Sequence, residues 1–283
     1  MPLPPLLPRL CAATVLSALM VAAGCSNAPP ADTRSPPPPA TPAADAAAPW
    51  AALLPPPVLL LGEQHDAPDH QRLQREAVAA LGARGALSAV VLEMAEAGHG
   101  TQGLPRDAGE TAVRAALAWN DAAWPWERYG PVVMEAVRAG VPVLGGNLPR
   151  ARMRDAMRDP AWDARVPPDV LRRQIAAMDA GHCGLLPSSQ WPGMARIQIA
   201  RDASLARAAA DARRPGQAVL LIAGAEHVRR DLGIPLHWDG SVRSRVAIAR
   251  ARSTTEPLPE GAADTVLPTP ALPPTDRCAA LRK

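Results

Sequence analysis

Five short apolar runs alternate with segments of helical periodicity, and this alternation constrains the fold more than any other feature of the sequence. The runs are continuous and rich in Val, Leu, Ile and Ala, which is typical of strands buried on both faces of a sheet. Strands that alternate with helices predict a single α/β domain with a mostly parallel central sheet flanked by helices. The expected strands are 58–61, 89–92, 142–144, 218–223 and 246–249, and the expected helices are 66–81, 110–118, 130–139, 168–179 and 194–213.

Proline marks where this domain begins and ends. Of the 34 prolines, 15 lie in residues 1–57 and six more in residues 255–274, so the segment between them has an ordinary proline content. Segments rich in proline favour polyproline II and bury little apolar surface. We therefore expect one folded domain over residues 58–254, between a Pro/Ala-rich tether over 25–57 and a Pro-rich tail over 255–283.

The first 24 residues are typical of a signal peptide. Arg9 precedes an apolar stretch, and small residues stand directly before Cys25. The string Val-Ala-Ala-Gly-Cys over 21–25 resembles the lipobox of bacterial lipoproteins, in which the cysteine is lipidated; ordinary secretion with cleavage elsewhere is the alternative. A lipidated Cys25 anchors a protein to the membrane surface without a spanning helix. Because Ser26 follows the cysteine, the sorting rule of that class predicts the outer membrane of a bacterial cell envelope, facing the periplasm.

The charge distribution argues against one class of binding partner, and the cysteines predict a disulfide. The 30 basic and 27 acidic side chains are interspersed, and without a basic stripe we expect no nucleic-acid partner. Cys11 lies in the signal peptide and Cys25 is the expected lipid site, so Cys183 and Cys278 remain. In an oxidising compartment this pair is expected to form a disulfide that ties the tail to the domain, with free thiols or a shared metal as alternatives.

Polar side chains follow four of the five expected strands. In a parallel sheet the carboxyl ends of the strands meet at one edge, where ligands bind. Residues of this kind at a single strand end are ordinary loop residues, but four strand ends together predict one functional site. The residues are Glu63 and His65 after the first strand, Glu93 after the second, Asn147 and Arg150 after the third, and His227 after the fourth.

The chemistry of these residues leaves several roles open. A carboxylate beside an imidazole orients the ring, accepts its proton or shares a metal, so Glu63, His65 and His227 are candidate ligands of a divalent metal. Glu93, at the sheet edge, needs a buried partner, for which His65 and Arg150 are the candidates. His70 lies on a helix face that either turns toward the site or serves the core. The sequence contains no zinc His-Glu-x-x-His spacing, phosphate loop, dinucleotide fingerprint or nucleophile elbow.

Several strings, in order along residues 58–240, resemble the ChaN-like haem-binding lipoproteins of the superfamily that includes Tiki, TraB and erythromycin esterase proteins. They begin with Leu-Leu-Gly-Glu-Gln-His-Asp-Ala-Pro-Asp-His-Gln over 60–71 and Val-Val-Leu-Glu-Met over 90–94. They continue with Gly-Gly-Asn over 145–147, Gly-His-Cys-Gly over 181–184, Ala-Arg-Asp-Ala over 200–203 and Ile-Ala-Gly-Ala-Glu-His-Val-Arg-Arg-Asp-Leu-Gly-Ile-Pro over 222–235.

This resemblance implies a lipid-anchored protein of haem or iron uptake that binds haem, as a homodimer. In the family a tyrosine holds the haem iron and a histidine of the partner subunit assists; Tyr129 is the single tyrosine here. The residues expected to bind the cofactor are therefore Tyr129, His65, His70, Asn147 and Arg150. The alternative is a hydrolase of the Tiki or erythromycin esterase type, in which a metal or the catalytic set Glu63, His65, Glu93 and His227 activates water.

Overall fold

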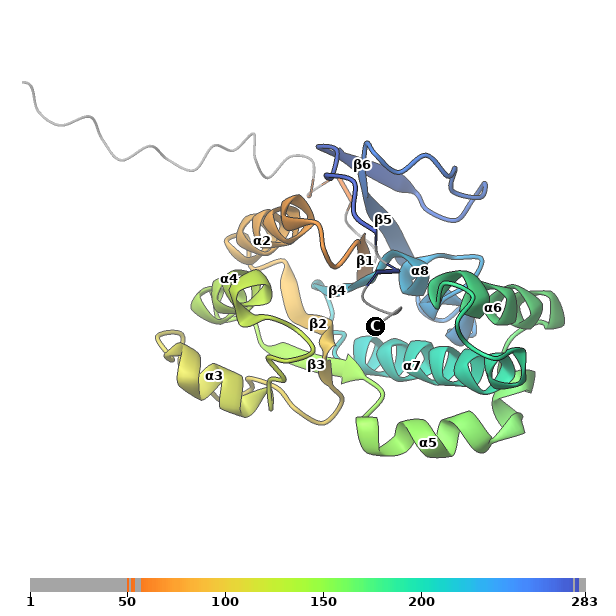
Figure 1. Cartoon of the computed structure of the whole chain (residues 1–283). Coiled ribbons are helices and arrows are strands. Elements are labelled where there is room, and N and C mark those ends of the chain that lie inside the picture. The colour runs from red at the N-terminus through yellow and green to blue at the C-terminus, as the bar shows by residue number, and fades with distance from the viewer. Residues whose placement is uncertain (1–49, 51, 54–56, 277, 280–283) are drawn as a thin grey trace, which may run out of the picture. The chain divides into compact units, whose positions relative to one another are not determined.

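A six-stranded, all-parallel sheet forms the centre of the protein, with the strand order β3-β2-β4-β1-β5-β6 (Figure 1). The structure is a computed structural model, and it describes residues 50, 52–53, 57–276 and 278–279. The predicted α/β class with a parallel central sheet is confirmed. The strands are β1 (Val58–Glu63), β2 (Leu87–Glu96), β3 (Val143–Asn147), β4 (Ala218–Gly224), β5 (Ser244–Ala251) and β6 (Thr265–Thr269).

Helices cover both faces of this sheet. On one face lie α2 (Pro68–Gly82), α3 (Glu110–Ala116) and α4 (Trp126–Ala139), and on the other α5 (Arg150–Arg158), α6 (Pro168–Gly181) and α7 (Trp191–Asp211) (Figure 1). The one-turn helix α8 (Ala225–Val228) directly follows β4. Short 3₁₀ segments complete the chain at η1 (Pro160–Arg165), η2 (Ser188–Gln190) and η3 (Ile234–His237).

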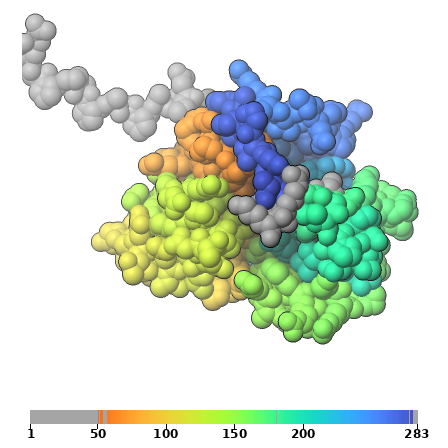
Figure 2. All heavy atoms as spheres, in the orientation of Figure 1, coloured from red at the N-terminus to blue at the C-terminus, as the bar shows by residue number. Residues whose placement is uncertain are grey.

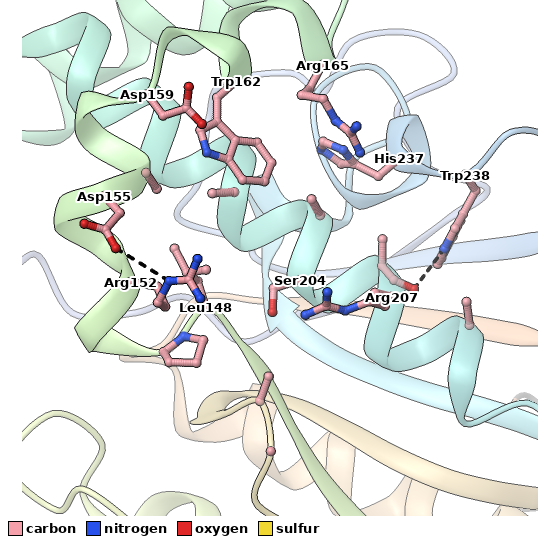
Figure 3. Close-up of a pocket in the computed structure, with 18 residues that line it drawn as sticks. Leu148, Arg152, Asp155, Asp159, Trp162, Arg165, Ser204, Arg207, His237 and Trp238 are labelled. Carbon is pink, nitrogen blue, oxygen red and sulfur yellow. Dashed lines mark hydrogen bonds and ion pairs between the residues drawn. The ribbon is translucent and has the colours of Figure 1, made fainter.

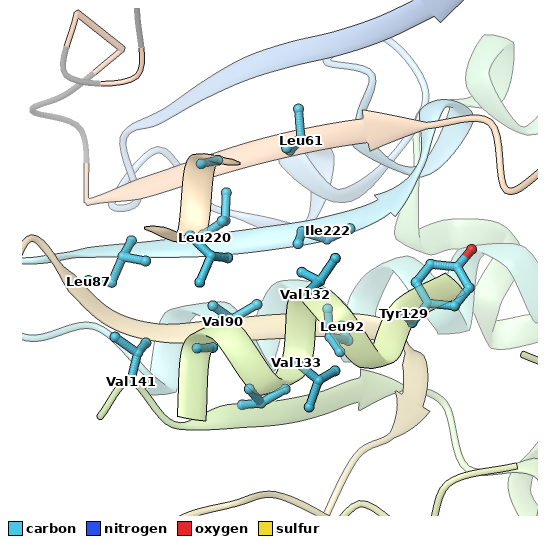
Figure 4. Packing of buried hydrophobic residues seen from close by; sticks show 14 of the residues in the cluster. Leu61, Leu87, Val90, Leu92, Tyr129, Val132, Val133, Val141, Leu220 and Ile222 are labelled. Atoms are coloured by element: carbon cyan, nitrogen blue, oxygen red, sulfur yellow. The ribbon is translucent and has the colours of Figure 1, made fainter. Parts of the chain in front are cut away.

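Alternate residues of the central strands pack into separate cores, which explains the continuous apolar runs. In β1, Leu59 and Leu61 join the core under α2 and α4, whereas Val58 and Leu60 join the core under α7. Because side chains alternate across a strand, a strand between two helical layers must be apolar at every position. Figure 4 shows the first core, where α4 lies in front of β2 and β3 and carries Tyr129 in its first turn.

The folded unit extends beyond the predicted limits of 58 and 254. At its start, Trp50 and Leu53 are buried in the core under α2 and α4. At its end, β6 lies within the segment predicted to be a Pro-rich tail, and it pairs with β5 alone. Pro268 within β6 has no N–H to donate, and an edge strand tolerates this because one side of its backbone needs no partner strand. The prediction therefore missed a strand that the proline content concealed.

The predicted disulfide between Cys183 and Cys278 is present, with its Cα atoms 5.8 Å apart. Because Cys183 follows α6, the bond returns the segment after β6 to the α6 side of the molecule, and Figure 2 shows this segment in dark blue. Within the described part of the chain, no helix has the length and hydropathy needed to cross a membrane. The predicted signal peptide, Cys25 and most of the tether lie outside the described residues.

Candidate functional site

Four of the predicted site residues, Glu63, His65, Glu93 and His227, meet at the carboxyl edge of the sheet, around a cleft of about 660 Å³. Glu63 ends β1 opposite Gly224, which ends β4, and Glu93 lies near the end of the neighbouring β2. His65 follows β1, and His227 lies in α8, just after β4. We call this hollow the carboxyl-edge cleft; it is lined by Glu63, Gln64, His65, Asp66, Glu93, Trp124, Gln198, Arg201, Gly224, Ala225, Glu226 and His227.

Four side chains converge on the buried carboxylate of Glu63. The Tyr129 hydroxyl donates to Oε1 at 2.7 Å, and His65 Nδ1 contacts the same oxygen at 2.7 Å. The amides of Gln71 and Gln74 donate to Oε2 at 2.6 and 2.5 Å. The two glutamines are three residues apart near the start of α2, so they lie on one helix face. Burial of a carboxylate is tolerated when its oxygens are hydrogen-bonded in this way.

A second buried carboxylate, Glu93, contacts donors from three other elements. Gly224 donates its backbone N–H to Oε2 at 2.7 Å. His227 Nε2 lies 3.4 Å from Oε1, and an Arg201 terminal nitrogen lies 3.6 Å from the same oxygen. A Cβ at position 224 would stand 3.0 Å from His65 Nε2 and 3.5 Å from Glu93 Oε2, so a side chain there would crowd the His65 imidazole.

His227 lies between two carboxylates. Its Nδ1 donates to Oδ1 of the buried Asp202 at 2.5 Å, and its Nε2 faces Glu93. Burial opposes charge on His227, but the two carboxylates outweigh it and raise the pKa of His227 to about 10. Burial likewise opposes charge on Glu93, yet His227, His65 and Arg201 hold the pKa of Glu93 well below its usual range. The pair is therefore an imidazolium against a carboxylate at neutral pH.

Asn147 has a supporting role at this edge. Its amide donates to the backbone oxygen of Glu93 at 2.8 Å, and its own oxygen accepts from Arg201 Nε at 2.9 Å. Arg201 is therefore the guanidinium beside Glu93. Arg150, one of two partners predicted for Glu93, is exposed, and its backbone N–H donates to Glu96. Arg201, and not Arg150, reaches Glu93 because Arg150 begins α5 at the rim, while Arg201 projects from the middle of α7.

His65 connects the two carboxylates and is the most accessible histidine of the cluster. Its side chain is 38% exposed, and its Nε2 lies 3.8 Å from Glu93 Oε2, beyond hydrogen-bond distance. The imidazole also packs edge-on against Trp124, with ring centroids 4.8 Å apart. Burial lowers and the carboxylates of Glu63 and Glu93 raise the pKa of His65, and the net shift is upward. His65 thus presents Nε2 to the cleft while Glu63 fixes the opposite nitrogen.

Two other predicted ligands are turned away from the cleft. The Tyr129 side chain is buried, and burial beside Glu63 raises the pKa of its hydroxyl. His70 accepts the backbone N–H of Gln64 at Nδ1 and contacts the Thr269 hydroxyl through Nε2 at 3.0 Å. It therefore joins the end of β1 to β6, which is the core role that the sequence left open.

The predicted metal set of Glu63, His65 and His227 is not formed. Among the described residues, no three His, Cys, Asp or Glu side chains are arranged to hold a metal ion. The reason is that Glu63 already accepts from four donors and both nitrogens of His227 face carboxylates. The sequence prediction did not assign roles to Gln71, Arg201 or Asp202, whose only signal was that they lie within the strings shared with the family.

A second hollow of about 470 Å³ adjoins the cleft. The two hollows share Glu93, Trp124 and Arg201, and the second is also lined by His99, Arg150 and Met153. Trp124 therefore forms a flat apolar wall common to both, with guanidinium groups at Arg201 and Arg150. This combination suits a planar molecule with acidic substituents, since such sites combine apolar walls with a few placed polar groups.

Comparison with known proteins shows the fold and the family of this chain. A solved structure described as cofacial heme binding to ChaN of Campylobacter jejuni matches with a TM-score of 0.59 and 22% identity, covering 74% of this chain and 87% of that one. At this identity the match concerns the fold. No curated protein matches the chain. The family model for haem-binding uptake proteins, Tiki superfamily, ChaN, matches residues 50–237, and the chain belongs to this family.

Proposed function

We propose that this protein binds haem in the carboxyl-edge cleft and its adjoining hollow. The observation that carries the proposal is His65, whose Nε2 faces the cleft without a hydrogen bond while Glu63 holds Nδ1. A carboxylate behind a histidine is the usual support for a metal-ligating imidazole. Bound haem would supply an iron centre for His65 to ligate. Family membership supports the same ligand.

The surroundings of His65 fit a porphyrin. Trp124 offers an apolar face next to the imidazole, and Arg201 and Arg150 offer cations for carboxylates at the rim. Tyr129 remains the alternative iron ligand from the family resemblance. To serve as one, its hydroxyl would have to leave Glu63 and lose a proton whose pKa is raised, so the geometry supports His65.

A haemin titration of the purified protein separates the two ligands. We expect a stoichiometric Soret shift for the native chain, strongly reduced in His65→Ala and retained in Tyr129→Phe. His182→Ala is the matched control, because His182 lies at the end of α6 and bonds the Met178 carbonyl. If the shift is lost in Tyr129→Phe and kept in His65→Ala, Tyr129 is the iron ligand. If the native chain shows no shift, the haem proposal is wrong.

The cellular setting is part of the same proposal. A lipid on Cys25 would hold the domain at the outer membrane, facing the periplasm, and haem binding there would serve iron uptake. Residues 21–26 support the anchor. Metabolic labelling with a radioactive fatty acid, in the native chain and in Cys25→Ser, tests the anchor directly. A homodimer is proposed as well, and sedimentation with and without haemin measures it.

A second candidate function is hydrolysis at Glu93. The observation in its favour is that Nε2 of both His65 and His227 faces the ionised Glu93 carboxylate, at 3.8 and 3.4 Å. This places an anionic carboxylate and two proton donors around one point in the cleft, where Glu93 would orient the attacking water by a hydrogen bond, since its lowered pKa makes it a weak base. Turnover of a p-nitrophenyl ester that disappears in Glu93→Gln would support it. Equal turnover in the native chain and the variant would exclude it.

A further inference from the structure

A separate pocket of about 760 Å³ lies between α5, α7 and η3, and Figure 3 shows its lining side chains. It shares none of the charged residues of the carboxyl-edge cleft. Its floor is one face of α7, where Ala200, Ala203, Ser204 and Arg207 follow at helical spacing. The small side chains leave the hollow open, and its size is typical of sites for small ligands.

Two buried polar atoms without partners belong to residues that line this pocket. They are Oγ of Ser204, a residue only 5% exposed, and Nε2 of His237. Four buried side-chain atoms lack a hydrogen-bond partner within the described part of the chain; the other two are the side-chain oxygens of Gln71 and Gln74, whose amide N–H groups donate to Glu63. Buried polar groups are nearly always hydrogen-bonded, so two orphans in one hollow indicate a missing partner. Burial and the nearby Arg165 lower the pKa of His237 to about 4, which keeps its imidazole neutral.

Positive charge gathers around the orphan hydroxyl. Figure 3 shows the guanidinium groups of Arg152 and Arg207 on either side of Ser204. Arg207 forms no ion pair with any described residue, and Arg152 has only a 3.6 Å contact with Asp155, in which both side chains are largely exposed. Exposed pairs of this length contribute little, so both guanidinium groups are available to a bound anion. Guanidinium groups bind carboxylates through paired, charge-assisted hydrogen bonds.

Two indoles form the apolar part of the lining. Trp162, in η1, and Trp238, after η3, are both partly buried and both face the pocket in Figure 3. Trp238 is fixed by its indole N–H, which donates to the Ala206 carbonyl at 3.0 Å. Rigid aromatic walls recognise planar rings through stacked or edge-on contacts. The pocket therefore combines an apolar wall for a ring with a polar floor for an anion.

We propose that this pocket is a second ligand site, which binds a planar aromatic carboxylate. The ring lies against Trp162 and Trp238. The carboxylate accepts hydrogen bonds from Arg152, Arg207 and the Ser204 hydroxyl. This assignment does not depend on haem binding in the carboxyl-edge cleft and its adjoining hollow, because no charged or aromatic residue lines both sites.

Indole N–H resonances of tryptophan locate the ligand directly. The probe is 2-naphthoate, added to the native protein, with assignments from single Trp→Phe variants. We expect the signals of Trp162 and Trp238 to shift while that of Trp124, which reports on the carboxyl-edge cleft, stays in place. Shifts confined to Trp124, or no shift at saturating probe, would overturn the proposal.

Binding affinities measured by calorimetry test which residues bind the carboxylate of the ligand. Arg152→Ala and Arg207→Ala are each expected to weaken naphthoate binding about tenfold, since a charge-assisted hydrogen bond is lost. Arg154→Ala is the matched control, because Arg154 lies on the same helix outside the pocket. The uncharged 2-naphthalenemethanol is expected to bind at least tenfold more weakly than naphthoate. Equal affinity of acid and alcohol, or unchanged affinity in both arginine variants, would contradict the carboxylate site.

Discussion

The carboxyl-edge cleft and the pocket on α7 differ in how many of their polar atoms have hydrogen-bond partners. In the carboxyl-edge cleft, every ionised group at the centre has partners: Glu63 accepts from four donors, and His227 lies between Glu93 and Asp202. In the pocket on α7, Ser204 and His237 carry buried atoms without any partner. In the cleft the unpartnered atoms are the Oε1 atoms of Gln71 and Gln74, behind the paired charged groups, whereas in the pocket they belong to residues that line the hollow itself.

This difference separates two kinds of binding site. A network of paired charged groups holds its side chains rigidly, so Nε2 of His65, which faces the cleft, is presented in a fixed position. An unsaturated pocket gains hydrogen bonds when a ligand enters, because its orphan groups then find partners. Substitutions in the first should therefore lower the stability of the folded protein, whereas substitutions in the second should mainly lower ligand affinity.

The largest effect is expected at Glu63. Glu63→Gln replaces one acceptor oxygen with an amide that faces two donors, and it leaves the remaining donors without a charged partner. We expect the free energy of unfolding to fall by about 3 kcal/mol. Urea denaturation followed by circular dichroism measures the change.

The matched control for that measurement is Glu226→Gln in the same cleft. The Glu226 side chain is 65% exposed and pairs with Arg229, so its loss should change the free energy of unfolding by at most about 0.5 kcal/mol. Equal losses in the two variants would mean that the Glu63 network contributes no more than a surface pair, and the contrast between the hollows would then disappear.

His227 should make the stability of the folded protein depend on pH above about pH 6.5, whereas His237 in the second pocket titrates below that pH. Its pKa rises from 6.5 to about 10 on folding, so its stabilising contribution is complete below pH 6.5 and declines as the pH rises through about 10. The full decline is on the order of 5 kcal/mol. Unfolding free energies between about pH 6 and pH 10 should fall in the native chain and stay flatter in His227→Gln. His99→Gln, with an exposed histidine, should keep the native slope; identical slopes in all three proteins would refute the assignment.

Much of the fold could be predicted from the sequence, because strands that are buried on both faces of a sheet appear as continuous apolar runs. It missed β6, since Pro268 is tolerated only at a sheet edge, and edge position is a tertiary property. The same logic holds for the cleft. Glu63, His65, Glu93 and His227 were predicted to meet because parallel strands end at one edge, and the structure places them within hydrogen-bond or ion-pair distance of one another.

The partners of those residues were harder to predict. Arg201 pairs with Glu93, and Arg150 does not, because of the helix that passes the end of β2. The local sequence does not show which helix this is. The pocket on α7 was not foreseen for a related reason. A face of alanines with one serine is typical of helix packing, and only the position of α5 and η3 shows that the face stays open.

The smallest expected effect concerns Ser204 and runs opposite to that at Glu63. Because the Ser204 hydroxyl has no partner, Ser204→Ala removes a buried polar group without breaking a hydrogen bond. Alanine is also the better helix former within α7. We therefore expect an unfolding free energy equal to the native value or higher by up to about 0.5 kcal/mol, measured by urea denaturation, together with weaker naphthoate binding. A stability loss above about 1 kcal/mol would show that the hydroxyl has a partner in the free protein, and the pocket would then resemble the cleft.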